Sequence, residues 1–392
     1  MERADLTAAE RELWDAFADG TRVDLGGPDP NGADAQISDW TESCTVRAAV
    51  VVALLLGAAP TKPGSTARLH LHGARIVGKL HLGDGDVDFS IGIIRCWFDE
   101  SVELGDARTR GIWIRRCRIP AIDAVAVVTA GPFLIENCRL DYVDLTEAHI
   151  QGRLDLTGTT LLGPDRVALE ALSMTVTQDF FLSRKSAIGT AVLSGSTIAG
   201  ALHIDPDNAP AICMDNVRYA AMQPETPVNE RLQLLRSDPH GYHPQPYEQL
   251  AAYYQSVDHD QEHRAVRLAR QRARRRTLTP WRRAGSAALD AIAGYGYAPG
   301  RALAILAAAA VAGTAYFLSV PPSPVSGNAR FDPSSAVLYV IDALLPTSPL
   351  GQERRWEAHT AAASNVLTAL HVLGWLLSIA IIPAVARALG RR

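Results

Sequence analysis

A short pattern that returns every 21 or 22 residues constrains the fold of this chain most. The pattern is an apolar residue, two variable residues, a small residue, one variable residue and a second apolar residue. It begins at Leu71, Ile93, Ile114, Ile135 and Leu156, and looser copies begin at Leu193 and Ile212. A fixed period of this length is typical of repeat folds, in which each unit buries its apolar face by stacking on its neighbours.

The period is too short for a pair of packed helices, but it fits one coil of a parallel β-helix. Apolar and polar residues alternate over residues 80–82, 102–104, 154–156 and 202–204, which predicts short strands with one inward face. We therefore expect a mainly β chain, with a right-handed parallel β-helix of about seven coils over residues 66–222. The longer step after the fifth copy predicts an inserted loop at residues 163–166.

Helices are expected on both sides of the repeats. Thr7 and Glu10 form a capping box, which predicts a helix ending near Gly20, and a second helix is expected over residues 45–56. Residues 1–65 should therefore form a helical cap over the open end of the β-helix. Residues 223–246 are rich in proline and polar residues, which indicates a linker. Residues 247–290 predict a helical hairpin of the tetratricopeptide type that continues into a basic juxtamembrane segment.

Two uncharged apolar runs, residues 302–320 and 366–386, are each about long enough to cross a bilayer at ~1.5 Å per residue. Residues 291–392 are therefore predicted to form a membrane region, with two transmembrane helices at about residues 301–320 and 366–387. The short apolar segment 335–345 between them should lie in the interface or re-enter the bilayer. Arginines precede the first run and follow the second, so both termini are expected in the cytoplasm, at the cell membrane.

Positive charge is concentrated next to the first apolar run. The chain has a net charge of −4, yet residues 264–283 hold nine arginines and no acidic residue. Such a block usually faces phosphate, and its position beside a predicted span favours membrane lipids over nucleic acid. The candidate lipid-binding residues are Arg270, Arg272, Arg274, Arg275, Arg276, Arg282 and Arg283.

Three cysteines recur with the repeat. Cys96, Cys117 and Cys138 should stack about 4.8 Å apart in adjacent coils. One interpretation is a thiol ladder for metal or redox chemistry. The favoured one is a position that needs a small side chain, because Ala74, Thr159 and Ser196 fill it in other copies. A cytoplasmic domain would keep the cysteines reduced.

Histidines supply the other candidate sites. His259 and His263 have the spacing of inverted zinc peptidases, but no glutamate occurs over residues 264–352 to complete the set of ligands. His70, His72, His81 and His203 alternate with inward apolar residues, which indicates a generic polar face. His371 lies inside the second predicted span, where an ionisable residue marks a pathway or a contact between helices.

Several motifs together resemble a known group of proteins. They are Val23-Asp24-Leu25 after the first helix, the Gly-Ala-Arg-Ile-x-Gly-x-Leu-x-Leu coil at residues 73–82, the hairpin at residues 247–264, and Gly-Tyr-Gly-Tyr-x-Pro at residues 294–299. The chain resembles actinobacterial membrane-anchored pentapeptide-like β-helix proteins, some of which are labelled membrane-associated oxidoreductases. The resemblance covers nearly the whole chain, and none of its motifs is catalytic.

The sequence favours a non-catalytic function. It contains no dinucleotide-binding glycine motif, no Cys-x-x-Cys and no haem-type Cys-His signature, so we predict no catalytic residue, cofactor or metal ligand. The leading hypothesis is a membrane-tethered cytoplasmic β-helix that acts as an interaction, scaffold or sensor module for an unidentified protein partner. An alternative is a homo-oligomeric two-span pore, gated by the β-helix and lined by residues 335–345 and the second span. A third is the oxidoreductase that the family label suggests.

Overall fold

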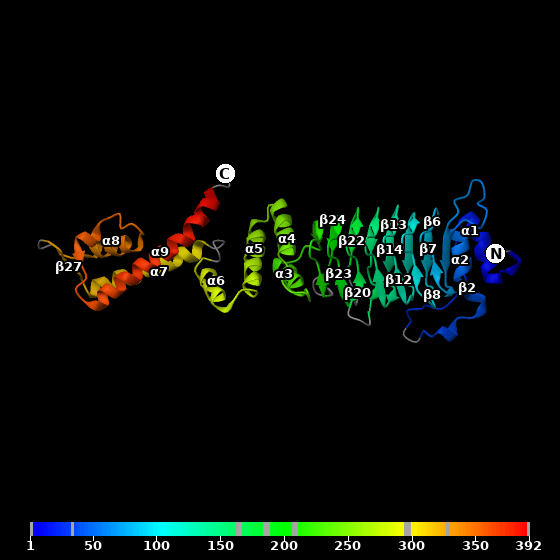
Figure 1. Cartoon of the computed structure of the whole chain (residues 1–392), viewed down its shortest axis with the longest axis horizontal. Helices are drawn as coiled ribbons and strands as arrows, with labels where there is room; N and C mark the ends of the chain where they lie inside the picture. Colours follow the sequence, from blue (N-terminus) through cyan, green and yellow to red (C-terminus); the bar gives the residue numbers. More distant parts are fainter. Residues whose placement is uncertain are drawn as a thin grey trace. The chain divides into compact units, whose positions relative to one another are not determined.

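The structure is a computed structural model, and it describes residues 3–32, 35–161, 163, 167–182, 189–205, 211–293, 299–326 and 330–389. The chain divides into two compact units, Met1–Val266 and Arg267–Arg392. Stacked short strands form most of the first unit, with helices before and after them, whereas helices form most of the second (Figure 1). The chain is therefore mainly β in its repeats and helical at both ends, as predicted.

The stacked strands form a parallel β-solenoid in which each coil crosses four faces. The first face holds β1 (Val23–Asp24), β3 (Leu69–His72), β7 (Ile91–Ile94), β11 (Ile112–Arg115), β14 (Phe133–Glu136), β18 (Leu154–Asp155), β22 (Phe180–Phe181) and the end of β24 (Thr197–His203). The second holds β2 (Thr45–Arg47), β4 (Arg75–Val77), β8 (Trp97–Phe98), β15 (Arg139–Leu140) and β19 (Thr160–Leu161). The third holds β5 (Leu80–His81), β9 (Val102–Glu103), β12 (Ala121–Asp123), β16 (Tyr142–Asp144), β20 (Val167–Glu170), β23 (Thr190–Val192) and β25 (Ile212–Cys213). The fourth holds β6 (Asp86–Val87), β10 (Arg108–Thr109), β13 (Val128–Thr129), β17 (His149–Ile150), β21 (Thr175–Val176) and the starts of β24 and β26 (Arg218–Gln223), and the end of β26 continues on the first face.

The register between strands confirms the repeat. Leu69, Ile91, Ile112, Phe133 and Leu154 pair in succession on the first face, in steps of 22, 21, 21 and 21 residues. The third face has seven strands among the described residues, which agrees with about seven coils. The next step, from Leu154 to Phe180, is 26 residues long, as an insertion requires. Of the predicted loop, residues 164–166 lie outside the described residues.

Each coil turns two corners through a residue with left-handed backbone. At the corner between the first and second faces, φ is 53° at Arg95, 53° at Arg116 and 54° at Asn137. At the corner between the third and fourth faces, φ is 56° at Asp106 and 78° at Gly195. A residue other than glycine is rare in this conformation, so the stacked backbone hydrogen bonds must hold it there.

The structure corrects the interpretation that all copies of the repeated pattern are equivalent. The copies that begin at Leu193 and Ile212 lie at the corner between the third and fourth faces, whereas the five earlier copies lie at the first corner. Both corners contain the same local motif, an apolar residue, a left-handed residue and then a small one. The local sequence alone therefore does not distinguish them.

The N-terminal helices cover the first coil, as predicted. α1 (Ala8–Asp19) has the capping box of Thr7 and Glu10, and Gly20 ends it with φ of 66°. α2 (Ala48–Leu55) is shorter than the predicted helix, because Thr45–Arg47 pair with β4 as strand β2. Both helices contact the first strands of the solenoid. Short 3-10 turns lie at Arg3–Asp5, Ile37–Asp39 and Glu42–Cys44.

Three helices follow the last coil. The predicted linker contains α3 (Val228–Arg236), and it is followed by α4 (Pro244–Ser256) and α5 (Asp260–Arg275). The prolines that flank α3 hid it in the sequence. Its Arg231 is 2% exposed and donates to Met222 O at 2.9 Å, Pro224 O at 3.0 Å and Tyr254 Oη at 3.2 Å. This buried cation connects α3 to the end of β26 and to α4.

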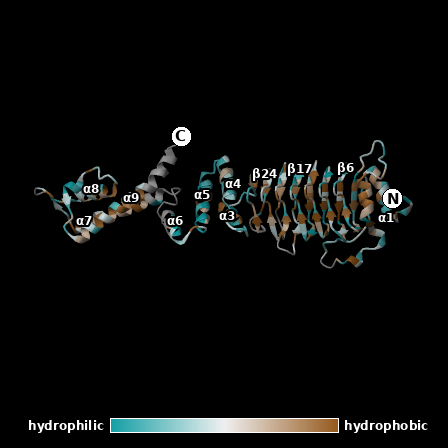
Figure 2. Ribbon diagram, in the orientation of Figure 1, coloured by the Kyte–Doolittle hydropathy of each residue, from teal (hydrophilic) through white to brown (hydrophobic). Residues whose placement is uncertain are grey.

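The second unit contains α6 (Pro280–Ala293), α7 (Pro299–Ser319), α8 (Pro333–Leu344) and α9 (Ala361–Leu389). β27 (Ser323–Pro324) pairs antiparallel with β28 (Trp356–Glu357), which follows α8 in the chain, and a 3-10 turn lies at Gln352–Arg354. Phe317, Tyr339, Leu344, Trp356 and Leu370 belong to its buried apolar cluster. α7 and α9 are largely hydrophobic, whereas α5 is largely hydrophilic (Figure 2).

Among the described residues, one stretch is both long and apolar enough to cross a bilayer, Ala361–Ser378 of α9. The apolar part of α7, Leu303–Ser319, falls short of that length. The structure thus supports the second predicted span by length and composition only, and the first span remains a prediction.

Candidate functional site

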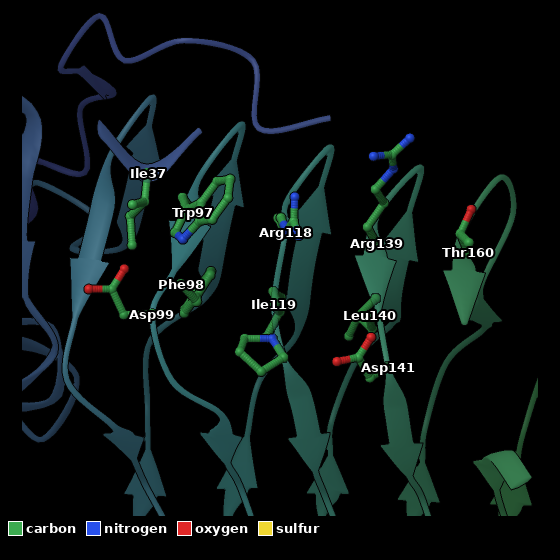
Figure 3. A pocket seen from close by; sticks show the side chains of 11 residues that line it. Ile37, Trp97, Phe98, Asp99, Arg118, Ile119, Arg139, Leu140, Asp141 and Thr160 are labelled. Atoms are coloured by element: carbon green, nitrogen blue, oxygen red, sulfur yellow. The ribbon is translucent and has the colours of Figure 1, made fainter. Parts of the chain in front are cut away.

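A groove of about 530 Å³ lies on the second face of the solenoid. Its outer wall is a row of side chains from successive coils, Trp97, Arg118, Arg139 and Thr160 (Figure 3). The opposite wall contains Asp99, Pro120 and Asp141, and Ile37 reaches the groove from the N-terminal segment. The 21-residue spacing of the outer row follows directly from the coil length. That spacing could have revealed the site, because each of these residues comes directly after the small residue of the repeat.

Some of the charged side chains in this groove are paired and others are not. The carboxylate of Asp99 accepts two hydrogen bonds from Arg75, at 3.0 and 2.7 Å. The guanidinium of Arg118 lies over the Trp97 ring, 4.6 Å from its centroid. Arg118 and Arg139 are exposed and have no carboxylate partner in the described part of the chain. The groove therefore presents two guanidinium groups from adjacent coils beside the Trp97 ring, which suits carboxylates on an extended ligand.

An N-terminal arm, residues 24–32 and 35–40 of the described chain, brings Ile37 to this groove. Arg95 Nη2 lies 3.1 Å from Asp24 Oδ1, and Arg116 pairs with Asp29. Asn31 Nδ2 donates to Asn137 O at 2.8 Å. The arm is thus bound along three successive left-handed corners of the solenoid, which positions Ile37 beside Trp97.

The three repeated cysteines stack as predicted, and their role is structural. Cys96 N lies 3.4 Å from Cys117 Sγ, Cys117 N lies 3.4 Å from Cys138 Sγ, and Cys138 N lies 3.3 Å from Thr159 Oγ1. Each small side chain therefore accepts the backbone N–H of the coil before it. Ser196 makes the equivalent contact to Met174 N, at 3.0 Å, but at the other corner of the coil. Burial, followed by the neighbouring thiols, raises the pKa of Cys117 well above its usual value, so this thiol is inert.

The outward histidines lie on two different faces. His81 is exposed and pairs with Glu103 at 2.8 Å on the third face, whereas His203 stacks on Phe181 on the first. Asp155 precedes Phe181 and His203 in the register of the first face, so it does not share the position of His81 and Glu103. This corrects the expectation of one common polar face.

His70 and His72 are less exposed than the alternation predicted. Their rings meet edge to face, with centroids 4.9 Å apart, and both are half-buried. Burial is the main cause that lowers the pKa of each. His70 lines a hollow of about 330 Å³ with Gly92 and Trp113. Neutral imidazoles are therefore expected there at neutral pH.

The His-x-x-Glu-His segment does not form a metal site. His263 is 6% exposed, and its Nδ1 lies 2.8 Å from Ala251 O inside the α4–α5 hairpin. The ring of His259 stacks on Tyr254 instead. The two imidazoles therefore make separate structural contacts.

The structure separates the candidate lipid-binding arginines into two groups. Arg272 donates to both oxygens of Asp290, at 2.9 and 3.0 Å, and Arg275 lies 3.3 Å from the same carboxylate. These arginines hold the pKa of Asp290 below its usual value. Arg270 also has interactions of its own, and Arg283 Nη2 donates to Arg276 O at 2.8 Å.

Arg274, Arg276 and Arg282 form the second group. All three are exposed, and within the described residues their guanidinium groups have no carboxylate partner. Trp281, which is 78% exposed, lies next to Arg282 in the chain. An exposed tryptophan beside unpaired arginines is typical of a segment at the headgroup layer.

His371 contacts the segment between α8 and α9. Its Nε2 lies 2.5 Å from Glu353 Oε1, and its Nδ1 lies 3.0 Å from Leu367 O. The Gly-Tyr-Gly motif before α7 lies outside the described residues. His371 therefore connects α9 to the segment that precedes it through the carboxylate of Glu353.

α8 packs alongside α9, and its last residue, Leu344, lies against Gly374 near the middle of α9. Gly313 of α7 faces Val340 and Leu370, and a Cβ at Gly374 would lie 2.2 Å from Leu344 O. Gly374 is 13 residues from the start of α9, which corresponds to ~20 Å along the helix. The chain then returns, because the buried carboxylate of Asp342 accepts from Leu350 N at 2.8 Å and Gln352 N at 2.7 Å. α8 and the segment that follows it therefore form a compact turn against α9.

No known protein family, curated protein or solved structure matches this chain. Functional inference therefore depends on the geometry described above.

Proposed function

We propose that this chain is a membrane-tethered, non-catalytic interaction module. In this proposal the second unit is the anchor, and the groove on the solenoid binds an extended acidic segment of a partner protein. The observation that carries the proposal is the apolar surface of α9. Of the 18 residues of Ala361–Ser378, 22% are buried, and Val372, Trp375 and Leu376 are each more than half exposed.

Exposed apolar side chains on α7 extend this surface. Val311 is 72% exposed and Leu303 is 57% exposed. Exposed apolar side chains in this number are unfavourable in water and favourable in lipid. It supports two antiparallel spans, with both chain termini in the cytoplasm and the connection between α7 and α8 on the other side.

Labelling of single cysteines tests this topology. The five native cysteines are buried, so background labelling should be low. Ser326→Cys, in the exposed connection after β27, should react with a membrane-impermeant maleimide on intact cells. The matched variant Thr277→Cys, in the exposed turn after α5, should react only after the cells are lysed. Protection of Ser326→Cys on intact cells would contradict the first span.

The groove is the proposed docking surface because it combines unpaired charge with an aromatic side chain. Arg118 and Arg139 pair across adjacent coils, whose backbones lie about 4.8 Å apart, so their guanidinium groups can bind successive acidic side chains of an extended peptide. A photo-crosslinking residue at Thr160 should capture a partner in cells, and Arg118→Glu with Arg139→Glu should abolish the crosslink. The same crosslinker at Arg108, exposed on the fourth face, serves as the control. Equal capture at both positions would exclude the groove as the docking site.

A pore is the second candidate, and the depth of α8 along α9 favours it. A short helix that enters beside two spans and returns by an irregular segment suits an oligomer, in which several copies surround a path. The outer surface of α8, however, exposes Val337, Leu338 and Ile341, which are all apolar. Light scattering of the detergent-solubilised chain tests this candidate: a closed oligomer with conductance that His371→Ala alters would support it, and a monomer would exclude it.

The oxidoreductase hypothesis has no supporting observation among the described residues. An absorption band of a flavin or haem, at roughly 350 to 700 nm in the purified protein, would support this hypothesis.

A further inference from the structure

Three side chains of types that bind metals meet where the last coil of the solenoid contacts the loop that follows α3. Cys213 ends β25, and Asp238 and His240 lie in the loop between α3 and α4. Cys213 Sγ is 3.2 Å from His240 Nδ1, which is 3.9 Å from Asp238 Oδ1. The three ligand atoms all lie within 4.8 Å of one another.

These separations are those of ligands around one ion. A thiolate at ~2.3 Å and an imidazole nitrogen at ~2.0 Å from a tetrahedral zinc ion are about 3.5 Å apart. The three donors come from two segments that are distant in the sequence, so their convergence results from the tertiary structure.

The orientation of the imidazole differs from that of a catalytic triad. In a triad, the acid and the nucleophile face opposite nitrogens of the histidine. Here both the thiol and the carboxylate face Nδ1 of His240. Convergence on one nitrogen suits a shared cation, and it does not suit proton transfer from the thiol to Nε2.

The charges at this cluster also favour a cation. A divalent cation would offset the negative charges of the Asp238 carboxylate and of a Cys213 thiolate. The side chain of Asp238 is 7% exposed, whereas that of His240 is 68% exposed, so water can reach the site from the imidazole side.

The loop is held in place by contacts of its own. His240 N donates to Asp238 Oδ1 at 2.8 Å, and Ser237 Oγ donates to Leu234 O at 2.7 Å. His243 Nδ1 lies 3.5 Å from Asp215 Oδ2, which joins the same loop to the turn after β25. Such supporting contacts orient ligands before the metal binds.

We propose that Cys213, Asp238 and His240 bind one thiophilic divalent cation of the zinc class, with water as the fourth ligand. Binding releases the thiol proton and joins the last coil to the α3–α4 loop. The cation is held by the Cys213 thiolate, one Asp238 carboxylate oxygen and His240 Nδ1.

Cobalt titration of the full-length protein in detergent tests the proposal, because Co²⁺ substitutes for Zn²⁺ and absorbs visible light. After chelator treatment, we expect one equivalent of Co²⁺ per chain, with a thiolate-to-cobalt charge-transfer band and the visible bands of a tetrahedral site. Zn²⁺ should displace the cobalt, and about one proton per metal should be released. Binding of less than one equivalent, or a spectrum without the thiolate band, would overturn the proposal.

Variants assign the ligands. Cys213→Ser should remove the charge-transfer band, and Asp238→Asn and His240→Gln should each weaken Co²⁺ binding by at least ~10-fold. His243→Gln, which changes the neighbouring histidine, and Cys44→Ser, which removes a distant buried thiol, should bind as the parent does. Circular dichroism checks folding. If Cys213→Ser does not fold, His240→Gln decides, because its exposed side chain can be changed without loss of the core. Retention of full affinity in His240→Gln would also contradict the proposal.

Discussion

The buried carboxylate of Glu10 shows how a single residue joins local and tertiary structure. Its side chain is fully buried and caps α1, with Thr7 N donating at 2.9 Å. Arg47 donates to it three times, from its backbone N at 3.0 Å, from Nε at 2.7 Å and from Nη2 at 2.6 Å. Burial acts to raise the pKa of Glu10, but the hydrogen bonds from Arg47 and Thr7 outweigh it, and the pKa is lowered overall. Glu10 thereby connects α1 to strand β2.

Glu10→Gln should destabilise the first unit by about 2 kcal/mol, because it removes the charge that several buried donors require. Denaturant unfolding followed by circular dichroism measures this effect, and Glu12→Gln, exposed on the same helix, is the matched control.

The pH dependence of this difference follows from the lowered pKa of Glu10. The stabilisation is complete above the pKa of about 4.3 in the unfolded chain, and it is lost as the pH falls through the folded value. The parent and Glu10→Gln should therefore differ most above about pH 5 and converge in acid. An unchanged difference in stability at pH 3 would contradict this assignment.

At the scale of elements, the corners of the solenoid determine which residues repeat. At several corners, the residue after the left-handed one is a cysteine, threonine or serine whose side chain accepts a backbone N–H from the preceding coil. Cys117 and Thr159 both meet this requirement, since sulfur and hydroxyl groups can accept hydrogen bonds. A larger side chain would not fit, because interiors are close-packed. The cysteine ladder is therefore explained by backbone hydrogen bonding as well as by size.

Exchange of Cys117 tests this explanation. Cys117→Ser keeps an acceptor for Cys96 N, whereas Cys117→Ala leaves that buried N–H without one, at a cost of about 1–3 kcal/mol. We therefore expect the serine variant to unfold at higher denaturant concentration than the alanine variant. Cys117→Leu, which overpacks the corner, should be the least stable. The opposite order for serine and alanine would show that size alone governs the position.

At the scale of the whole molecule, the uneven charge is what the proposed membrane tether requires. Arginines that are paired with Asp290 hold α5 and α6 together, and the remaining exposed ones, Arg274, Arg276 and Arg282, are free for headgroups in the described part of the chain. Each such arginine contributes ~1 kcal/mol near an anionic surface. The net charge of −4 conceals this local concentration.

Replacement of Arg274, Arg276 and Arg282 by Gln should leave the protein in the membrane and reduce its preference for anionic lipid by about 100-fold, at ~1 kcal/mol each. Lipid binding in nanodiscs of defined composition measures this preference. Arg354→Gln with Arg355→Gln, on the segment between α8 and α9, is the control, since topology predicts the opposite side of the membrane for it. A similar loss in the control would show that the effect is not specific to the basic segment.

The sequence by itself determined the parts of this protein that depend on local periodicity. The step between inward residues such as Ile112 and Phe133 equals the length of one coil, so the solenoid could be predicted from apolar spacing alone. The capping box of Thr7 and the apolar composition of α9 are likewise local. The short helix α3 was missed, because prolines on either side of it conceal its pattern.

Only the tertiary structure decided where distant side chains meet. The groove requires an arm whose Asn31 contacts Asn137, 106 residues away, and the proposed metal site requires a loop that folds back to Cys213. Asp290 pairs with arginines for which the sequence showed no partner, and this contact also depends on the tertiary structure. So does the contact between Leu344 at the end of α8 and Gly374 of α9. The physical reason is that these contacts depend on the stacking of whole coils and helices, and no local pattern of residues encodes which surfaces are brought together.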